Sequence, residues 1–198
     1  MAIRYDRENA IYCRVAFAGC VGAGKATCMQ GLQKKFTTRP QGKVTWVHSP
    51  PIGAMWLNFL AWKAPNGGRE LWIDLHGVTG QEHDPANEEH ARWLLEGMDG
   101  VVFVVDSSRA RIEDNRLAFV NLQRMKAYCR QPPDKTVLLF NKRDLPAAEL
   151  ASVDEIGAVI DPCREIDFAE GAAREDLRCV IGAVKASIKP AVARLESR

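Results

Sequence analysis

The chain of 198 residues carries 27 lysine and arginine residues against 25 aspartate and glutamate residues, and its formal net charge is +2. So small a charge provides no electrostatic reason to expect nucleic acid or an anionic membrane surface as a partner. A chain of this length with 46% hydrophobic residues is long enough for one α/β domain with a fully covered central sheet, and short for two. Length and composition therefore predict a single domain over residues 1–198.

The sequence shows no recognisable signal for a membrane or for an oxidising compartment. Its first eight residues are rich in charge and have no apolar signal core, and no run of about 18 apolar residues occurs. Lipidation motifs are absent, and the six cysteines have no C-x-x-C spacing, which is typical of reduced, buried thiols. We therefore expect a cytoplasmic protein without a lipid anchor or a transmembrane segment.

The predicted elements alternate between strands and helices along the chain. A strand over 11–17 precedes a glycine-rich turn and a helix over 26–36. After these we expect five strands, at 44–47, 71–75, 101–106, 136–140 and 163–168. Further helices are expected near 88–97, at 111–130 and at 175–195, and one more is expected to begin at the capping-box sequence 152–155. This alternation predicts a three-layer α/β fold: a six-stranded, mostly parallel sheet with helices on both faces and ligands at the carboxyl ends of the strands.

The turn after the first strand has the spacing of a phosphate-binding loop, G-x-x-x-x-G-K-[ST], from Gly19 to Ala26. Gly19, Gly22, Ala23 and Gly24 would turn their backbone N–H groups toward phosphate oxygens, and Lys25 would reach the outer phosphates. A chance glycine-rich turn is the alternative interpretation. The strand before the turn and the helix after it favour the phosphate loop.

A second motif, Asn141-Lys142-Arg143-Asp144, follows the predicted buried strand at 136–140. Alone, such a tetrapeptide would be interpreted as a solvated turn. Together with the glycine loop, with Gly80-Gln81, and with the blocks at 97–106 and 141–146, it resembles the small Ras-like GTPases. The resemblance runs from about Ile3 to the last helix, and it is closest to the bacterial MglA-like branch, which sets cell polarity in gliding bacteria.

The resemblance implies a P-loop GTPase fold, GTP or GDP as the ligand, and a role for each matching residue. Asp144 would accept hydrogen bonds from N1 and N2 of guanine, and adenine would leave this carboxylate unpaired. The stem of Lys142 would cover the base, and Asn141 would tie the loop. The resemblance also assigns a base contact to Ala169, places Gly80 in the second switch, and makes Gln81 the residue that orients the attacking water.

Magnesium is doubtful, because the chain departs from the family where hydroxyl or carboxylate groups surround the ion. Ala26 replaces the loop threonine, Gly77 replaces an aspartate or threonine, and Ala54 stands near the switch threonine. Gly53 falls near an arginine that MglA-like proteins use in the transition state, while Thr27 offers a hydroxyl next to Ala26. Phosphoryl transfer depends on such groups, so we expect slow or lost GTP hydrolysis.

A protein partner is the remaining expectation. Met55, Trp56, Phe59 and Trp62 form an apolar run that either packs in the core of the chain or binds a partner, and the resemblance suggests a Roadblock-domain protein. The resemblance implies a guanine-nucleotide-binding regulator or scaffold of polarity or motility with weak GTP hydrolysis, and two other functions stay open. One is an active switch GTPase that such a partner completes, and the other is a different P-loop enzyme, such as a kinase or an ATPase.

Overall fold

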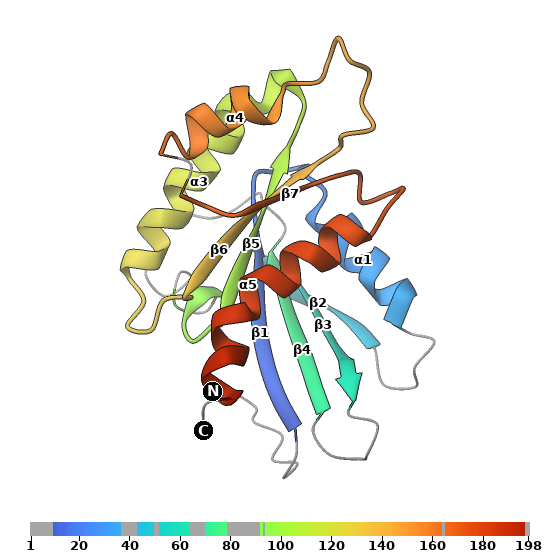
Figure 1. Cartoon of the computed structure of the whole chain (residues 1–198), viewed down its shortest axis with the longest axis vertical. Coiled ribbons are helices and arrows are strands. Elements are labelled where there is room, and N and C mark those ends of the chain that lie inside the picture. The colour runs from blue at the N-terminus through green and yellow to red at the C-terminus, as the bar shows by residue number, and fades with distance from the viewer. Residues whose placement is uncertain are drawn as a thin grey trace.

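The computed structural model in Figure 1 describes residues 10–36, 43–49, 52–63, 70–78, 92, 94–163 and 165–196. Its strands form one seven-stranded sheet in the order β2-β3-β4-β1-β5-β6-β7. The strands are β1 (Ala10–Ala18), β2 (Lys43–Ser49), β3 (Ile52–Lys63), β4 (Glu70–Val78), β5 (Gly100–Asp106), β6 (Lys135–Asn141) and β7 (Phe168–Glu170). The helices are α1 (Lys25–Phe36), the short η1 (Arg109–Arg111), α3 (Ile112–Ala127), α4 (Val153–Ile160) and α5 (Arg178–Glu196).

The sheet is mostly parallel, and the predicted α/β fold is confirmed. β1 lies between β4 and β5 and is parallel to both, and β5, β6 and β7 continue in the same direction. The two outer strands on the other side, β2 and β3, pair antiparallel with each other, and β3 pairs antiparallel with β4. All motif residues at the ends of β1, β5 and β6 therefore meet at one edge of the sheet.

Two predicted features of the sheet were wrong. No strand was predicted between residues 47 and 71, but residues 52–63 form β3, so the sheet has seven strands where six were predicted. This strand was not predicted because apolar residues lie on both of its faces, so the sequence shows no clear alternation of apolar and polar residues. The last strand was expected at 163–168, but β7 spans only Phe168–Glu170 and pairs with Leu138–Phe140.

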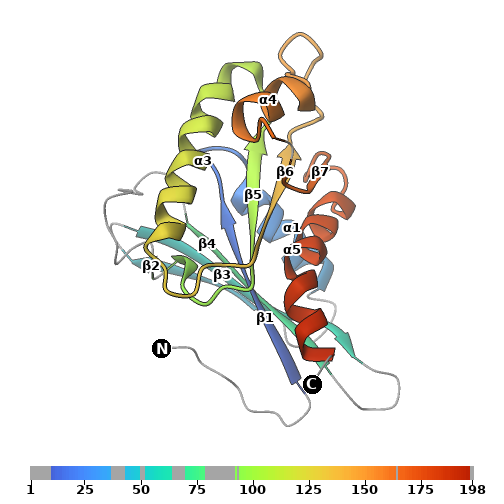
Figure 2. The same ribbon diagram turned by 60° about the vertical axis from the view of Figure 1, so that its left-hand side comes forward.

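Helices cover both faces of the sheet, as Figure 2 shows: α1 and α5 lie on one side, and α3 and α4 on the other. On the first side, Val15 and Phe17 of β1 pack with Met29 of α1 and with α5 residues such as Val184. On the second side, Phe103 of β5 meets Phe119 of α3 edge to face, with ring centroids 5.1 Å apart. Every residue of β5 is buried, as the continuous apolar run predicted.

The sequence signals that predicted the helices are confirmed at the described residues. Ser152 and Glu155 form the predicted reciprocal capping box at the start of α4. Within the predicted helix near 88–97, the described helical residues are Arg92, Leu94 and Leu95, and both leucines are buried. None of the described helices is both long enough and apolar enough to cross a membrane.

The apolar run in β3 contributes to the core of the chain itself. Met55 and Phe59 are each only 3% exposed, and the Phe59 ring stacks on Phe36 of α1 with centroids 4.4 Å apart. An exposed partner surface that includes Met55 and Phe59 is therefore ruled out. Trp56 is partly buried, and the side chain of Trp62 lies outside the described residues.

This packing predicts that Phe59→Ala destabilises the isolated chain. Loss of a buried phenylalanine costs roughly 3 kcal/mol of unfolding free energy, because both transfer energy and contacts with Phe36 are lost. Leu117→Ala in α3 is the control, because Leu117 is 48% exposed and its truncation leaves no cavity. Denaturant unfolding of both variants measures the difference. Equal stability of the two variants would contradict the assignment of Phe59 to the core.

Candidate nucleotide-binding site

The glycine loop connects the carboxyl end of β1 to the start of α1. Gly19 has a φ of 138° and Gly24 a φ of 100°, and L side chains rarely adopt either conformation. A Cβ at Gly19 would also run into the backbone carbonyl of Val104 in β5, and one at Gly24 would run into the side-chain amide of Asn141. The loop is thus pressed against the ends of β5 and β6. Gly22, with a φ of 77°, borders open space instead.

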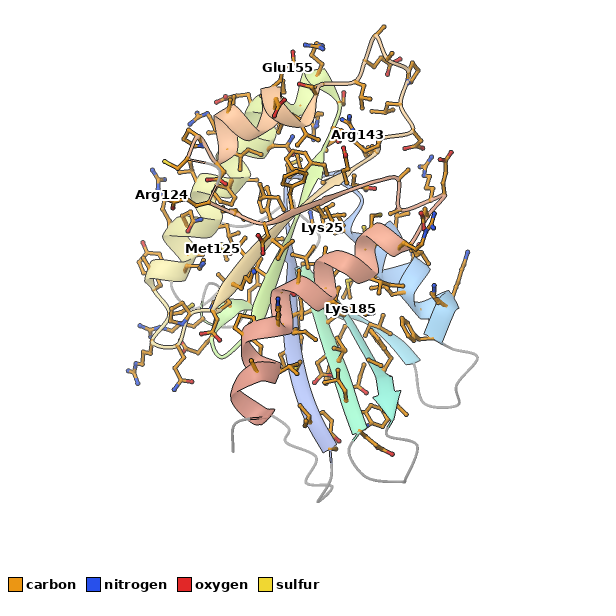
Figure 3. All side chains as sticks on the ribbon, in the orientation of Figure 1. Lys25, Arg124, Met125, Arg143, Glu155 and Lys185 are labelled. Carbon is orange, nitrogen blue, oxygen red and sulfur yellow. The ribbon has the colours of Figure 1, made fainter. Side chains whose placement is uncertain are left out.

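Lys25 lies in the first turn of α1, near the centre of the molecule in Figure 3. Its side chain is 5% exposed, and its Nζ donates to the carbonyl oxygens of Gly19 and Cys20, both at 2.8 Å. Burial lowers the pKa of Lys25 from 10.5 to about 8. The first turn of α1 has no acidic residue that would offset the positive end of the helix dipole. Lysine and dipole together give this end of the sheet an anion-binding character.

Asn141 joins three segments that are far apart in the sequence. Its Nδ2 donates to the backbone oxygen of Ala23 at 2.8 Å, and its Oδ1 accepts from the backbone N–H of Ala173 at 2.9 Å. All the groups involved are buried. Asn141 therefore holds the glycine loop, the end of β6 and the loop after β7 at one place, which is the geometry expected of an asparagine that ties the loop.

The structure does not place Ala169 where the resemblance put it. Ala169 lies within β7 and pairs with Leu139 of β6, so it is part of the sheet and packs against the core. The residue beside Asn141 is Ala173, in the loop after β7. Ala173 replaces Ala169 as our candidate for the backbone contact to the base. β7 begins five residues later than the predicted strand, so the loop that follows it lies further along the chain.

The rest of the N-K-R-D motif turns its side chains in different directions. Lys142 has a φ of 64°, and its Nζ lies 2.7 Å from Oδ2 of Asp106 at the end of β5. Arg143 is anchored away from the glycine loop, because its Nη1 donates to the carbonyl of Ala151 at 2.7 Å. Asp144 is exposed, and its carboxylate makes no hydrogen bond or ion pair to another described residue. Its carboxylate is thus available to accept from a ligand.

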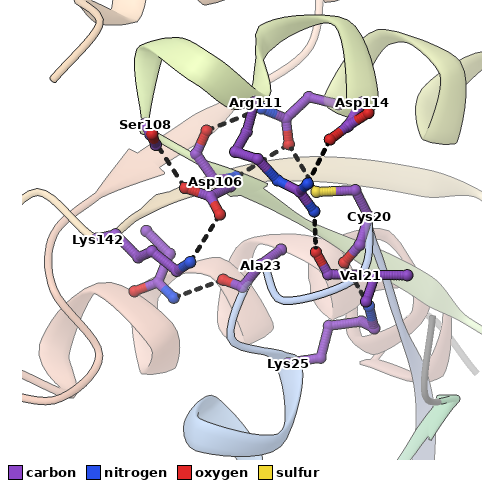
Figure 4. Close-up of polar contacts among 11 residues, drawn as sticks. Cys20, Val21, Ala23, Lys25, Asp106, Ser108, Arg111, Asp114 and Lys142 are labelled. Carbon is purple, nitrogen blue, oxygen red and sulfur yellow. Dashed lines mark hydrogen bonds and ion pairs between the residues drawn. The ribbon is translucent and has the colours of Figure 1, made fainter. Parts of the chain in front are cut away.

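Sequence reasoning missed the residues of η1 and α3 that support the glycine loop. Asn115 is fully buried, and its Oδ1 accepts from the backbone N–H of Asp106 at 3.0 Å and from the thiol of Cys20 at 3.3 Å. Arg111 donates to the carbonyl of Val21 at 2.6 Å and pairs with Asp114, as Figure 4 shows. The available signal was an asparagine at helical spacing from Phe119 and Leu122 on the buried face of α3.

The environment of Cys20 argues against a reactive thiol. Burial raises the pKa of Cys20, and Asp106 raises it further. The thiol donates to Asn115, as a neutral S–H group does. Cys20 is therefore a structural residue of the loop in its protonated form.

The residues at the magnesium positions do not fit that ion. A Cβ at Gly77 would lie 2.8 Å from Sδ of Met29 and 3.2 Å from Cε of Met55, so the space is small and apolar. The side chain of Ala26 has no oxygen and packs partly against the core, while Thr27 is half-buried beside it. No group of three metal-ligating side chains occurs among the residues that the structure describes.

Four positions of the predicted switch regions have less support. Gly53 and Ala54 lie at the start of β3, where they pair with His48 and with Val47 and Val78 respectively. Gly80 and Gln81 lie outside the described residues. The assignment of Gln81 to water orientation therefore stays a prediction.

The burial of Lys25 predicts that GDP binding takes up protons in mildly alkaline solution. At about pH 8.5 most of the unliganded Lys25 is neutral, and a nearby phosphate raises its pKa and restores the proton. Calorimetric titration in buffers of different ionisation enthalpy should give different binding heats at about pH 8.5 and nearly equal heats at about pH 7. Heats that do not depend on the buffer at the higher pH would show that Lys25 stays charged without ligand.

Comparison with known proteins agrees with this geometry. The chain is 30% identical over 149 residues to the mutual gliding-motility protein MglA of Myxococcus xanthus (strain DK1622), and the match covers 74% of each chain. No model of a protein family matches the sequence. Because identity and coverage extend across most of both proteins, the chain belongs to the MglA-like family of small GTPases.

Proposed function

We propose that this edge of the sheet binds GDP or GTP, with the phosphates in the glycine loop and the base against the N-K-R-D loop. The observation that carries the proposal is the double contact of Asn141, whose amide joins Ala23 of the glycine loop to Ala173 of the loop after β7. A phosphate site and a base site are thereby held next to each other at a fixed distance. Family membership supports guanine nucleotide as the ligand.

Each part of the site has a separate task in this proposal. The backbone N–H groups from Gly19 to Gly24 and the ammonium of Lys25 bind phosphate oxygens, for which Lys25 exchanges its two carbonyl partners. The exposed carboxylate of Asp144 accepts from N1 and N2 of guanine. Adenine offers no such pair of hydrogens, so its binding would leave the carboxylate desolvated and unpaired.

Hydrolysis of GTP by this chain alone is proposed to be slow. Magnesium offsets charge on the β- and γ-phosphates during phosphoryl transfer, and an arginine there contributes about 10³ to 10⁵ in rate. The apolar surroundings of Gly77 and the methyl group of Ala26 remove two oxygens that would hold the ion. The site supports binding of the nucleotide better than it supports turnover.

The cellular role is inferred from the relative. MglA of Myxococcus xanthus is by name a gliding-motility protein. We propose that this chain is likewise a regulator or scaffold in motility or cell polarity, and that it works through a protein partner. A Roadblock-domain partner would have to bind residues other than Met55 and Phe59, which are buried. No observation favours a kinase or an ATPase.

Preference for guanine is tested with Asp144→Asn. This change should weaken GDP binding by about 3 kcal/mol, since a charge-assisted pair of hydrogen bonds is lost. The control is Asp154→Asn, an exposed residue in the first turn of α4 that should not alter GDP affinity. Displacement of a fluorescent GDP analogue measures both variants. Equal competition by ATP and GTP in the unmutated protein would refute the assignment of Asp144.

Magnesium dependence is tested by titrating GDP with the ion present and with excess chelator. Affinity in the unmutated protein should change less than about threefold, because nucleotide and water alone would hold the ion. Ala26→Thr restores one hydroxyl and should introduce a dependence on magnesium. A sharp loss of GDP from the unmutated protein on chelation would mean that another oxygen, such as that of Thr27, replaces the missing ligand.

A further inference from the structure

Asp106 has no part in the nucleotide contacts described so far, yet its carboxylate is buried and fully engaged. The residue ends β5 and is 2% exposed. Its Oδ1 accepts from the backbone N–H of Ser108 at 3.0 Å, and its Oδ2 accepts from Nζ of Lys142 at 2.7 Å. A carboxylate is costly to bury unless it is paired, so the contact with Lys142 is a strong constraint on both side chains.

Lys142 would not hold this position by itself. Its φ of 64° is unfavourable for a residue other than glycine, and its side chain is 35% exposed, so the ammonium has water as an alternative partner. The ion pair with Asp106 draws the ammonium inward across the ends of β5 and β6 (Figure 4). The aliphatic stem of Lys142 is stretched between its own Cα and that carboxylate.

Asp106 is itself held rigidly by α3. Asn115 accepts from the backbone N–H of Asp106 at 3.0 Å and donates from Nδ2 to its carbonyl at 2.8 Å. The same Oδ1 accepts from Cys20 in the glycine loop. The carboxylate that meets Lys142 is therefore held in place relative to the phosphate loop by a buried network.

We propose that Asp106 is a positioning residue for the purine base: it anchors the ammonium of Lys142 so that the lysine stem stays in place as one wall of the base site. The inference rests on the proposed nucleotide function, and it assigns Asp106 to the binding of the base and not of the phosphates. Loss of the ion pair releases the stem into solvent, and a nucleotide then has to order it again on binding. A ligand that has no base does not depend on this wall.

The test compares GDP with inorganic pyrophosphate, each as a competitor of a fluorescent GDP analogue. Asp106→Asn keeps the size of the side chain but removes the charge that holds Lys142, so GDP affinity should fall about tenfold. Pyrophosphate affinity should not change. Asp106→Glu is the second variant. It keeps the charge, displaces the carboxylate by one methylene, and should show the same selective loss.

Lys142→Met distinguishes positioning from a general structural effect. Because methionine keeps an apolar stem and lacks the ammonium, the addition of Asp106→Asn to Lys142→Met should cause no further loss of GDP affinity. Glu155→Gln is the control for loss of an ion pair elsewhere, since Glu155 pairs with the exposed Arg109 at 2.6 Å. This variant should bind both ligands as the unmutated protein does.

Several outcomes would overturn the proposal. The proposal is wrong if GDP affinity is unchanged in both Asp106 variants, or if GDP and pyrophosphate lose affinity equally. It is also wrong if Asp106→Asn causes a further loss in the Lys142→Met background, because Asp106 would then not act through Lys142. Failure of the proposed function looks different, because the unmutated protein would then bind no GDP. That result would remove the inference together with the function on which it rests.

Discussion

The buried amide of Asn141 is the contact on which the geometry of the site depends. It satisfies a carbonyl of the glycine loop and an N–H of the loop after β7 at the same time, at 2.8 Å and 2.9 Å. Both partners lack an alternative partner in a strand ladder, so removal of the amide would leave two buried backbone groups unpaired. A shorter or apolar residue could not replace it. The close approach of Gly24 to this amide leaves no space for a Cβ, which explains the glycine at that position.

The two lysines of the site have different kinds of partner. Lys25 has only carbonyl oxygens as partners, and desolvation lowers its pKa to about 8. Lys142 meets a carboxylate, so its positive charge has a buried counter-ion. Lys25 is therefore the lysine whose charge a phosphate could pair with, whereas Lys142 is already paired with Asp106. Lys25, at the glycine loop, is thus the lysine of the site that has no carboxylate partner among the described residues.

The sequence predicted those parts of the fold that depend on local pattern. The continuous apolar run at 101–106 predicted a strand that is covered on both faces, and the glycine spacing from Gly19 to Gly24 predicted a tight turn with positive φ angles. β3 was missed because its apolar residues show no alternation that would separate a strand from a buried connection. Asn115 was missed because the sequence alone does not show that the fold brings Asp106 and Cys20 beside it. Without these partners, a polar residue on an apolar helix face gives no sign of a role.

The two positions that lack magnesium ligands differ in how easily they could regain them. Ala26 lacks only a hydroxyl in a loop whose backbone, glycines and lysine are otherwise in place. At Gly77 the space is occupied by Met29 of α1 and Met55 of β3, and both methionines belong to the same buried cluster as Phe17. A carboxylate there would displace methionines in two elements and desolvate a charge among apolar atoms. The packing of Met29 and Met55 thus prevents a magnesium ligand at position 77. A variant at Ala26 alone can therefore restore only one of the two oxygens.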